Sequence, residues 1–387
     1  MKNETYMRRA IELAKRGEGL VNPNPMVGCV VVKDGRIIAE GWHERYGGFH
    51  AERNALLSCT EDTTGAELYV TLEPCCHTGK TPPCTEIIIE RGISAVYIGS
   101  DDPNPLVAGH GIEILKNAGI AVETHVLKDE CDALNEIFFH YITTKRPFVA
   151  MKYAMTLDGK IAMAAGRETA GTGEDSEHTS EELPAQNSRL RITGPEANAH
   201  VHGLRKRYRA ILVGVGTVLA DDPMLNVRLG DSAAHPIRII LDSNLRTPLT
   251  TQVVKTAKEI PTIIAHTTTE VEAYKNAGVI LWQLPADSDG HVDLKALFEK
   301  MGEEGIDSVL VEGGSAIHGS LLAHPELIDR VYAYISPKLI GGSEALTPVG
   351  GAGITEENGA IRLTDKEIIP LGEDVLVTGR VSSDHQK

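Results

Sequence analysis

The stretch that decides the fold of this chain reads Glu73-Pro74-Cys75-Cys76-His77-Thr78-Gly79-Lys80-Thr81-Pro82-Pro83-Cys84, and it follows His50-Ala51-Glu52 by about one α/β unit. The apolar run before Glu73 predicts a strand, and helices are expected to start near His50 and near Cys84. An imidazole and two thiolates at such junctions are ligands that zinc prefers, with a fourth position left open for water. The sequence therefore predicts a zinc centre in an α/β domain.

The carboxylate of Glu52, on the same turn as His50, gives this zinc centre its expected chemistry. Zinc lowers the pKa of a bound water, so that hydroxide exists near neutral pH. A carboxylate that does not ligate the metal can take that proton and return it to a ring nitrogen and then to a departing amine. On spacing alone, Cys76 or His77 could replace Cys75, or could add a fourth ligand and close the centre as a structural zinc site.

The loop between the two cysteines is more specific. The common deaminase pattern is Pro-Cys-x-x-Cys, whereas eight residues separate Cys75 from Cys84. This longer loop resembles the deaminase half of the bifunctional deaminase–reductases of riboflavin biosynthesis, and the resemblance extends over nearly the whole chain. It implies that His50, Cys75 and Cys84 bind zinc, that Glu52 is the catalytic proton shuttle, and that the first domain is a cytidine-deaminase-like α/β/α sandwich.

The resemblance implies two successive reactions. The first domain would hydrolyse the exocyclic amine of 2,5-diamino-6-(ribosylamino)-4(3H)-pyrimidinone 5′-phosphate, and the second would reduce the ribosyl group to ribityl. The implied cofactors are Zn2+ and NADPH, and the implied partner is this small-molecule pyrimidine ribosylamine phosphate. Two other functions stay open on the residues alone: a nucleoside or tRNA deaminase with an unrelated C-terminal domain, and a zinc-stabilised interaction protein.

Polar residues around the zinc motif match the substrate-contacting positions of the family. They are Asn24, His43, His77, Lys80, Asp102 and Asn104. Through the resemblance, His77 and Lys80 would hold the ribose phosphate and Asn24 would read the pyrimidine edge. Taken singly, His43 is equally explained as a histidine satisfied within the fold, and Asp102-Pro103-Asn104-Pro105 as a turn.

Alternating helical and β patterns divide the chain into two blocks. The first block predicts helices over 5–16, 50–57, 84–91 and 111–117, and strands over 28–33, 36–42, 67–72, 95–99 and 120–124. The second predicts strands over 148–154, 210–215, 237–241, 262–265, 308–311 and 330–335. Lys145-Arg146-Pro147 marks the break, so we expect two domains, residues 1–146 and 147–387, and a fragment ending near Lys145 that deaminates on its own. The resemblance implies a dihydrofolate-reductase-like α/β fold for the second domain.

Two strand–glycine–helix junctions follow the break, at Ile211-Leu212-Val213-Gly214-Val215-Gly216-Thr217 and at Val309-Leu310-Val311-Glu312-Gly313-Gly314-Ser315. A glycine that opens a helix lets backbone N–H groups approach a pyrophosphate, so two such junctions suit a dinucleotide. Tight αβ turns with no ligand are the competing interpretation. The resemblance implies a cofactor site at Ala154, Thr217, Asp221, Ser243, Gly314, Ser315, Ala316, Ile317, His318, Gly319 and Ser320, and a substrate site at Arg205, Leu225, Arg228 and Glu312.

Several of these residues have more than one interpretation. Arg205 and Arg228 could clamp a phosphate through paired guanidinium donors, or could form surface salt bridges. Asp242 could bind the ribose of NADH, but Ser243 and Arg246 beside it suit a 2′-phosphate, which favours NADPH. Lys152 could donate a proton to the sugar or form a structural ion pair. The family has a Trp before Ile192-Thr193, where this chain has Arg191, so no cofactor contact is transferred to that loop.

Composition excludes other classes of protein. The formal charge of −16 argues against general nucleic-acid binding, which needs clustered Lys and Arg. Charges throughout Met1–Arg16 argue against a signal peptide or a membrane span, so we expect a cytoplasmic enzyme. Separately, we expect the chain to form a homo-oligomer. Its cysteines outside the zinc motif are expected to be ordinary thiols. From Glu168 to Gln186 there are six acidic residues and no Lys or Arg, which predicts a solvated, mobile loop.

Overall fold

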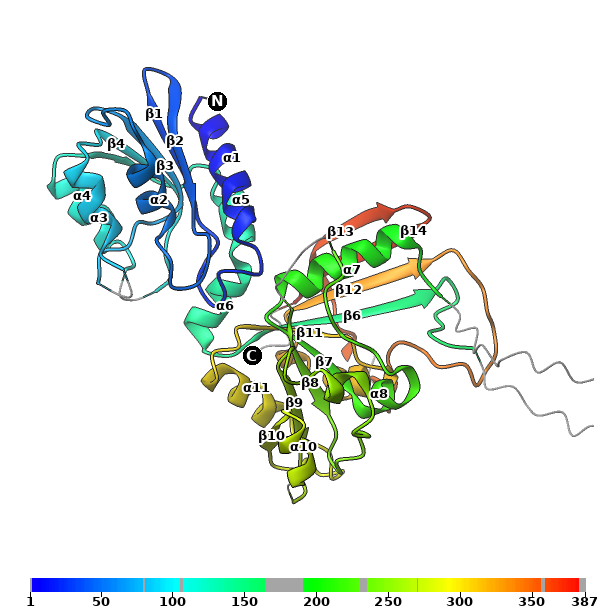
Figure 1. Ribbon diagram of the computed structural model, residues 1–387. Helices are drawn as coiled ribbons and strands as arrows, with labels where there is room; N and C mark the ends of the chain where they lie inside the picture. Colours follow the sequence, from blue (N-terminus) through cyan, green and yellow to red (C-terminus); the bar gives the residue numbers. More distant parts are fainter. Residues whose placement is uncertain are drawn as a thin grey trace, which may run out of the picture.

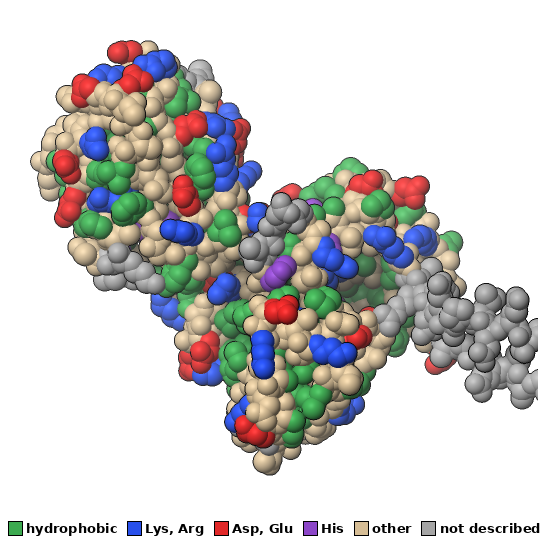
Figure 2. Space-filling model, in the orientation of Figure 1, with side chains coloured by type: hydrophobic (Ala, Val, Ile, Leu, Met, Phe, Trp, Pro, Cys, Tyr) green, Lys and Arg blue, Asp and Glu red, His purple; other side chains and the backbone are tan. Residues whose placement is uncertain are grey.

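A computed structural model describes residues 2–78, 81–104, 107–163, 191–229, 235–269, 271–355 and 359–382. Lys80 and the acidic segment Glu168–Gln186 therefore lie outside the described residues. The chain forms two units, each built on one sheet, which appear as two lobes in Figures 1 and 2. We call them the five-stranded unit and the nine-stranded unit.

The five-stranded unit has the strand order β2-β1-β3-β4-β5, in which β3, β4 and β5 are parallel and β1 is antiparallel to both β2 and β3. Its elements are α1 (Lys2–Ala14), the 3₁₀ turn η1 (Lys15–Gly17), β1 (Gly28–Lys33), β2 (Arg36–Trp42), α2 (Ala51–Ser58), β3 (Glu67–Leu72), α3 (Cys84–Glu90), β4 (Ala95–Ser100), α4 (His110–Asn117), β5 (Ala121–Glu123), α5 (Lys128–Leu134) and α6 (Glu136–Thr144). All nine elements expected in this block are present.

Alternating side chains of the central strands pack on opposite faces of this sheet. Val30 and Val32 of β1 contact the core formed with α1, whereas Cys29 and Val31 contact the core formed with α2, α3 and α4. This period of two is what a strand covered on both faces requires. The predicted α/β/α sandwich is therefore the observed fold.

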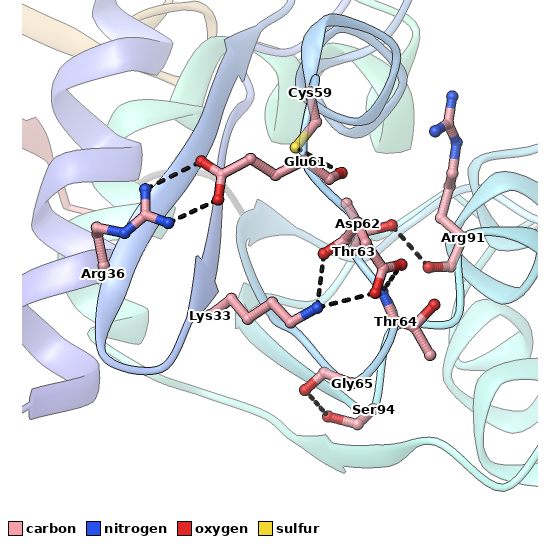
Figure 3. A network of polar contacts seen from close by, with 10 residues as sticks. All are labelled: Lys33, Arg36, Cys59, Glu61, Asp62, Thr63, Thr64, Gly65, Arg91 and Ser94. Carbon is pink, nitrogen blue, oxygen red and sulfur yellow. Dashed lines mark hydrogen bonds and ion pairs between the residues drawn. The ribbon is translucent and has the colours of Figure 1, made fainter.

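A polar network fixes the amino end of β3, at the far end of that strand from the cysteine motif (Figure 3). In the β1–β2 hairpin, Arg36 forms a two-pronged pair with Glu61 at 2.6 and 3.0 Å, and Lys33 Nζ lies 3.0 Å from Asp62 Oδ2. Thr63 Oγ1 donates to the Arg91 carbonyl at 2.7 Å. The network ties the hairpin and the end of α3 to the loop that enters β3, and so fixes the strand that carries the motif.

The nine-stranded unit has the order β10-β9-β8-β7-β11-β6-β12-β14-β13, and all neighbouring strands are parallel except that β14 is antiparallel to both β12 and β13. Its elements are β6 (Phe148–Thr156), α7 (Pro195–Arg207), β7 (Ala210–Gly214), α8 (Val215–Asp221), β8 (Ile237–Leu241), α9 (Gln252–Lys255), β9 (Thr262–His266), α10 (Glu272–Asn276), β10 (Ile280–Gln283), α11 (Leu294–Glu303), β11 (Ser308–Val311), α12 (Ser315–Leu322), the 3₁₀ turn η2 (Pro325–Leu327), β12 (Arg330–Ser336), β13 (Leu363–Leu371) and β14 (Asp374–Val381).

Helices cover both faces of this larger sheet. α11 and α12 pack on one face, and α7, α8, α9 and α10 pack on the other. All six strands expected here are present, although Val215 begins α8 rather than ending β7. The β13–β14 hairpin was not predicted, because β13 is largely exposed and a bulge between Thr364 and Glu367 interrupts its pairing. Within the described ranges, the chain has no helix both long and apolar enough to cross a lipid bilayer.

Candidate functional site

Three predicted ligands meet where β3 ends and two helices begin. His50 precedes α2 in an extended conformation, Cys75 follows β3, and Cys84 is the first residue of α3. His50 Nδ1 lies 3.4 Å from Cys75 Sγ and 3.5 Å from Cys84 Sγ, and the three ligand atoms lie within 4.8 Å of one another. Tetrahedral zinc bonded to sulfur and nitrogen at its usual lengths sets these atoms about 3.5 Å apart. The spacing therefore fits one zinc ion.

The electrostatics of the two cysteines also suit a cation. The pKa of Cys75 is lowered, because the Cys84 thiol and His50 donate hydrogen bonds to its sulfur. The Cys84 backbone N–H donates to the same sulfur at 3.4 Å. The pKa of Cys84 is raised by its hydrogen bond to Cys75 and by burial. A divalent ion among the three groups would favour both thiolates.

Glu52 lies on the first turn of α2, beside this cluster, and is 3% exposed. Burial raises the pKa of its carboxyl to about 7, and the neighbouring Cys75 adds to that rise. A carboxyl with a pKa near neutral pH can both accept and donate a proton during a reaction. Among the described residues, the groups placed to share a metal are His50, Cys75 and Cys84, so Glu52 stays outside the ligand set.

The cluster opens into a cavity of about 320 Å³. Five of the six predicted substrate residues line it: Asn24, His43, His77, Asp102 and Asn104. His77 Nδ1 is buried there without a hydrogen-bond partner among the described residues, so a ligand can supply one. Neither Cys76 nor His77 joins the metal cluster, which leaves the fourth position open.

Hydrogen bonds fix how two of these polar residues face the cavity. His43 Nδ1 donates to the Phe49 carbonyl at 3.0 Å, so its Nε2 accepts from Asn24 Nδ2 at 3.2 Å. Burial lowers the pKa of His43, which keeps the ring neutral. Burial raises the pKa of Asp102 to about 6, while its Oδ1 accepts from the Asn104 N–H at 2.8 Å. The site thus offers both neutral and ionisable polar groups to a heterocycle.

Other residues of this cavity were not predicted from sequence. Glu73 accepts from the backbone N–H groups of Gly109 and Gly111 at 3.0 and 3.1 Å, and so holds the start of α4 against the site. An apolar wall comes from Phe138, Tyr141 and Ile142 of α6. No helix was predicted over α6, and only its packing shows that these three side chains face the pocket.

In the nine-stranded unit, three of the four predicted substrate residues gather around one histidine. Arg205 on α7 forms a two-pronged pair with Glu312, at the end of β11, at 2.7 and 2.9 Å, and Lys152 Nζ lies 3.5 Å from Glu312 Oε2. The Arg228 N–H donates to His202 Nδ1 at 3.2 Å. Arg205, Arg228 and Glu312 all act on the charge of His202, which sequence reasoning missed.

The pKa of Glu312 shows that this cluster is charged. Burial alone would raise that pKa, but the charges of Lys152 and Arg205 and their hydrogen bonds lower it to about 2. The ion pair foreseen for Lys152 is therefore present, and Arg205 is held by Glu312. Leu225 packs its side chain into the core beneath α8, whereas Arg228 is exposed. Of the two arginines, Arg228 is the one open to solvent.

The two glycine junctions lie side by side, because β7 and β11 are neighbours in the sheet. A Cβ on Gly214 or on Gly313 would lie only 2.8 Å from atoms of Ile317 in α12. A Cβ on Gly314 would lie 3.8 Å from Thr217 Oγ1 on α8. Only glycine lets the two helix starts approach each other so closely, and both present backbone N–H groups at one edge of the sheet.

A cavity of about 900 Å³ opens beside these junctions. Its lining includes Gly214, Gly216, Ser243, Ala316, Ile317 and Ser320, with Arg246 at the same wall. Asp242 is fully buried, and its Oδ2 accepts from the backbone and the hydroxyl of Thr247, both at 2.7 Å. Its carboxylate is thus held by Thr247 and is not part of the cavity lining, whereas Ser243 and Arg246 are.

The remaining predicted cofactor residues lie in the surrounding structure. Ser315 begins α12, Asp221 ends α8, and Ala154 lies in β6. The ring of His318 is buried, with Nδ1 2.9 Å from the Pro348 carbonyl and Nε2 3.4 Å from that of Val311. A Cβ on Gly319 would lie 2.5 Å from the Gly350 carbonyl oxygen. His318 and Gly319 therefore face the protein and position α12.

Comparison with known families agrees with this division of sites. Residues 147–377 match the RibD C-terminal domain, and residues 1–100 match the cytidine and deoxycytidylate deaminase zinc-binding region. The riboflavin biosynthesis protein RibD of Actinobacillus pleuropneumoniae is 53% identical over 96% of this chain and 93% of its own length. That of Escherichia coli strain K12 is 37% identical over 97% of this chain and 98% of its own length.

Solved structures give the same result. Acinetobacter baumannii RibD, form 1, superposes with a TM-score of 0.83 at 34% identity, covering 98% of this chain and 99% of its own. The diaminohydroxyphosphoribosylaminopyrimidine deaminase/5-amino-6-(5-phosphoribosylamino)uracil reductase of Thermotoga maritima gives 0.80 at 39% identity, with the same coverage. Both superpositions span the two units of the chain.

Proposed function

Because this chain belongs to the RibD family of riboflavin biosynthesis proteins, we propose which residues carry its two reactions. The chain is a bifunctional enzyme: a zinc-dependent deaminase and an NADPH-dependent reductase. One observation carries the residue assignment best. The His50, Cys75 and Cys84 cluster opens beside buried Glu52 into a cavity lined by the polar residues expected to contact a pyrimidine.

In the deaminase, His50, Cys75 and Cys84 would hold zinc, which supplies a water of lowered pKa when bound. Glu52 would move two protons: one from the attacking water to the ring nitrogen, and a second from the added hydroxyl group to the leaving amine. Its buried setting supports this role, because a pKa of about 7 allows both transfers near neutral pH. The amine leaves as ammonia, and the ring keeps the oxygen of the water.

Substrate recognition follows from the polarity of the cavity walls. Asn24, held by His43, and the Asp102–Asn104 turn supply donors and acceptors for the pyrimidine edge. His77, with its unsatisfied Nδ1, lies on the wall from which Lys80 follows in the sequence, so these two would bind the 5′-phosphate. The substrate is 2,5-diamino-6-(ribosylamino)-4(3H)-pyrimidinone 5′-phosphate.

In the reductase, NADPH supplies a hydride to the ribosyl group of the deaminated product. Backbone N–H groups at the starts of α8 and α12 would bind its pyrophosphate, and Ser243 and Arg246 its 2′-phosphate. Exposed Arg228 would bind the substrate phosphate. Lys152 would donate a proton to the oxygen that the sugar carbon releases when it accepts the hydride. Glu312, at the carboxyl end of β11, holds the Lys152 ammonium in place.

Three further proposals concern the domain boundary, the location in the cell and the oligomeric state. We place the domain boundary between residues 146 and 147, in the segment that joins α6 to β6. We place the enzyme in the cytoplasm. We also infer a homo-oligomer, because Leu157, Leu339 and Ile368 are 64%, 74% and 73% exposed and apolar side chains of this size are usually covered. Sedimentation measurements test this last point, and a single monomeric species contradicts it.

The alternative functions fit the chain less well. A nucleoside or tRNA deaminase with an unrelated C-terminal domain does not account for the RibD C-terminal match. A zinc-stabilised interaction protein leaves Glu52 and the cavity without a role. The test is a coupled assay of ammonia release and NADPH oxidation with the pyrimidine ribosylamine phosphate. Both signals are expected, in that order, and ammonia without NADPH oxidation contradicts the reductase assignment.

A further inference from the structure

Helix α6 belongs to both units of the molecule. One face of it carries Phe138, Tyr141 and Ile142, which line the deaminase cavity. At its carboxyl end the chain continues through Lys145 into β6, an interior strand of the reductase sheet. Figure 1 shows α6 at the junction between the two lobes. One wall of the deaminase cavity is thus also the element that meets the reductase.

Buried polar contacts fasten α6 to the nine-stranded unit. Glu136 accepts from Arg207 at 3.0 Å and from Arg330 at 2.8 Å, and the side chains of these two arginines are 25% and 13% exposed. One turn on, His140 Nδ1 lies 3.2 Å from Asp329 Oδ1. Groups so far withdrawn from water hold each other more firmly than surface pairs do.

The cavity wall itself is held by a backbone carbonyl of the other unit. Tyr141, whose ring lines the cavity, donates its hydroxyl hydrogen to the Gly302 carbonyl of α11 at 3.1 Å. A Cβ on Gly302 would lie 2.1 Å from the Lys145 carbonyl oxygen, so only glycine allows α11 to approach the end of α6. The orientation of the Tyr141 side chain therefore depends on the position of α11.

A second link holds the loop that carries Asn24. Asn22 Nδ2 donates to Asp307 Oδ2 at 2.8 Å, and Asp307 is 1% exposed at the start of β11. The other end of this loop is fixed from α6, because Asn135 exchanges hydrogen bonds with the backbone of Met26 at 2.8 and 2.9 Å. Asn24 thus lies between two anchors, one of which belongs to the reductase.

We propose that the reductase unit holds one wall of the deaminase pocket and the loop that carries Asn24 in place, with Asp307 and Gly302 as positioning residues for deamination. Neither residue touches the pyrimidine; each acts through a residue next to or within the pocket, Asn22 or Tyr141. This inference rests on the proposed function of the zinc site. It also sharpens the expectation for a fragment ending near Lys145, which should release ammonia by itself but with a raised KM.

The consequence is a binding effect on the deaminase that arises from a residue of the reductase. Asp307→Ala removes the anchor of Asn22, so Asn24 and the loop it stands on gain freedom that substrate binding must then restrict. One buried hydrogen bond of this kind corresponds to roughly a five- to tenfold change in an equilibrium. We expect the KM for ammonia release to rise by roughly that factor while kcat changes little.

The experiment is a double-mutant cycle in the full-length enzyme. Asn22→Ala removes the same hydrogen bond from the deaminase side, so either single variant should raise KM about equally and the double variant should raise it no further. Asp307→Asn keeps one oxygen that can face Asn22 and should restore most of the lost affinity. Asp374→Ala is the matched control. This carboxylate is also buried, but it accepts from the Gly194 N–H at the amino end of α7, whereas α6 is contacted by Arg207 at the carboxyl end of that helix.

The control readouts are NADPH oxidation with the deaminated product, zinc content and melting temperature. If Asp307→Ala is less stable but its deaminase KM is that of Asp374→Ala, the inference is overturned. Additive effects of Asn22→Ala and Asp307→Ala, or an Asp307→Asn variant no better than Asp307→Ala, also overturn it. A wild-type enzyme that releases no ammonia contradicts the proposed function itself, whereas wild-type and variant enzymes with equal KM contradict only the inference.

Discussion

The zinc site gathers three ligand side chains within 4.8 Å of one another beside a cavity of about 320 Å³, whereas the proposed cofactor site is a cavity of about 900 Å³ beside two glycine junctions. In the first site, rare side chains carry the chemistry, and each is fixed at the start of a helix or the end of a strand. In the second, backbone N–H groups and helix starts carry the binding. One substitution is therefore expected to abolish activity at the first site, but only to weaken binding at the second.

The largest effect is expected at the zinc ligands. Cys84→Ala removes one of three ligand atoms, so zinc should be lost together with all measurable deamination, while NADPH oxidation with the deaminated product persists. Metal analysis and the two separate assays check this. Cys59→Ala, a cysteine outside the cluster, is the matched control and should keep both zinc and activity. A Cys84→Ala enzyme that retains zinc and deaminates would falsify the ligand assignment.

The charged cluster of the reductase should give the next largest effect, and one that depends on pH. Glu312→Gln leaves Lys152 and Arg205 buried without their anion, which typically costs about 3–5 kcal/mol of unfolding free energy. The pKa of Glu312 is lowered to about 2 in the folded state, below its ordinary value of 4.5, by the charges of Lys152 and Arg205. Its stabilisation is therefore fully present above the unfolded-state pKa and is lost as the pH falls from about 4.5 toward about 2.

Denaturant titrations of wild type and Glu312→Gln at neutral pH and near pH 3 measure this effect. The difference in unfolding free energy between the two proteins should narrow as the pH falls. The surface pair of Lys295 and Glu326, 3.1 Å apart, supplies the matched control, and Glu326→Gln should change stability by no more than about 1 kcal/mol. A Glu312→Gln protein as stable as Glu326→Gln would show that the buried cluster contributes little.

A smaller effect is expected where the cofactor wall depends on an exposed side chain. The Arg246 side chain is 62% exposed at the edge of the proposed cofactor cavity. Arg246→Ala should raise the NADPH dissociation constant by roughly tenfold or less, since solvent weakens an exposed charge pair. Fluorescence titration with NADH is the internal control, because NADH lacks the 2′-phosphate and should bind both proteins alike. An equal loss for both cofactors would remove Arg246 from 2′-phosphate recognition.

The smallest effect is expected from the acidic segment Glu168–Gln186. Its composition offers too little apolar surface to offset the entropy of ordering, about 1–2 kcal/mol per residue. Shortening it to a few residues should leave the melting temperature, ammonia release and NADPH dissociation constant unchanged. A large rise in that constant at an unchanged melting temperature would instead assign the segment a role at the cofactor.

The contrast between the two sites also explains what the sequence could predict. His50, Cys75 and Cys84 are readable because few residue types bind zinc and their spacing fits one strand–helix unit. The glycine junctions could be predicted as backbone features. Leu225 and His318, however, match binding positions of the family although their side chains contact the protein interior. The β13–β14 hairpin escaped prediction because its edge strand buries little apolar surface.

Long-range partners explain most of what the sequence could not give. His202 meets Arg228 and Glu312 only when α7 packs beside the end of β11, and nothing in its neighbours along the chain marks it. Asn22 and Asp307 are 285 positions apart, and their hydrogen bond follows from how the two units meet. Tyr141 donates to the Gly302 carbonyl on α11, a partner that no local pattern around Tyr141 indicates. Local patterns fix the elements, whereas such pairs arise from tertiary packing.

The central claim is that one chain holds two catalytic sites with different chemistry, and that Glu52 moves protons in the first without binding the metal. Glu52→Gln keeps the size of this buried side chain but removes its ability to exchange a proton. We predict that this variant retains one zinc per chain and loses ammonia release by a factor on the order of 10²–10⁴. It should still oxidise NADPH at the wild-type rate when given the deaminated product. Zinc lost from this variant, or ammonia release at the wild-type rate, would contradict the claim.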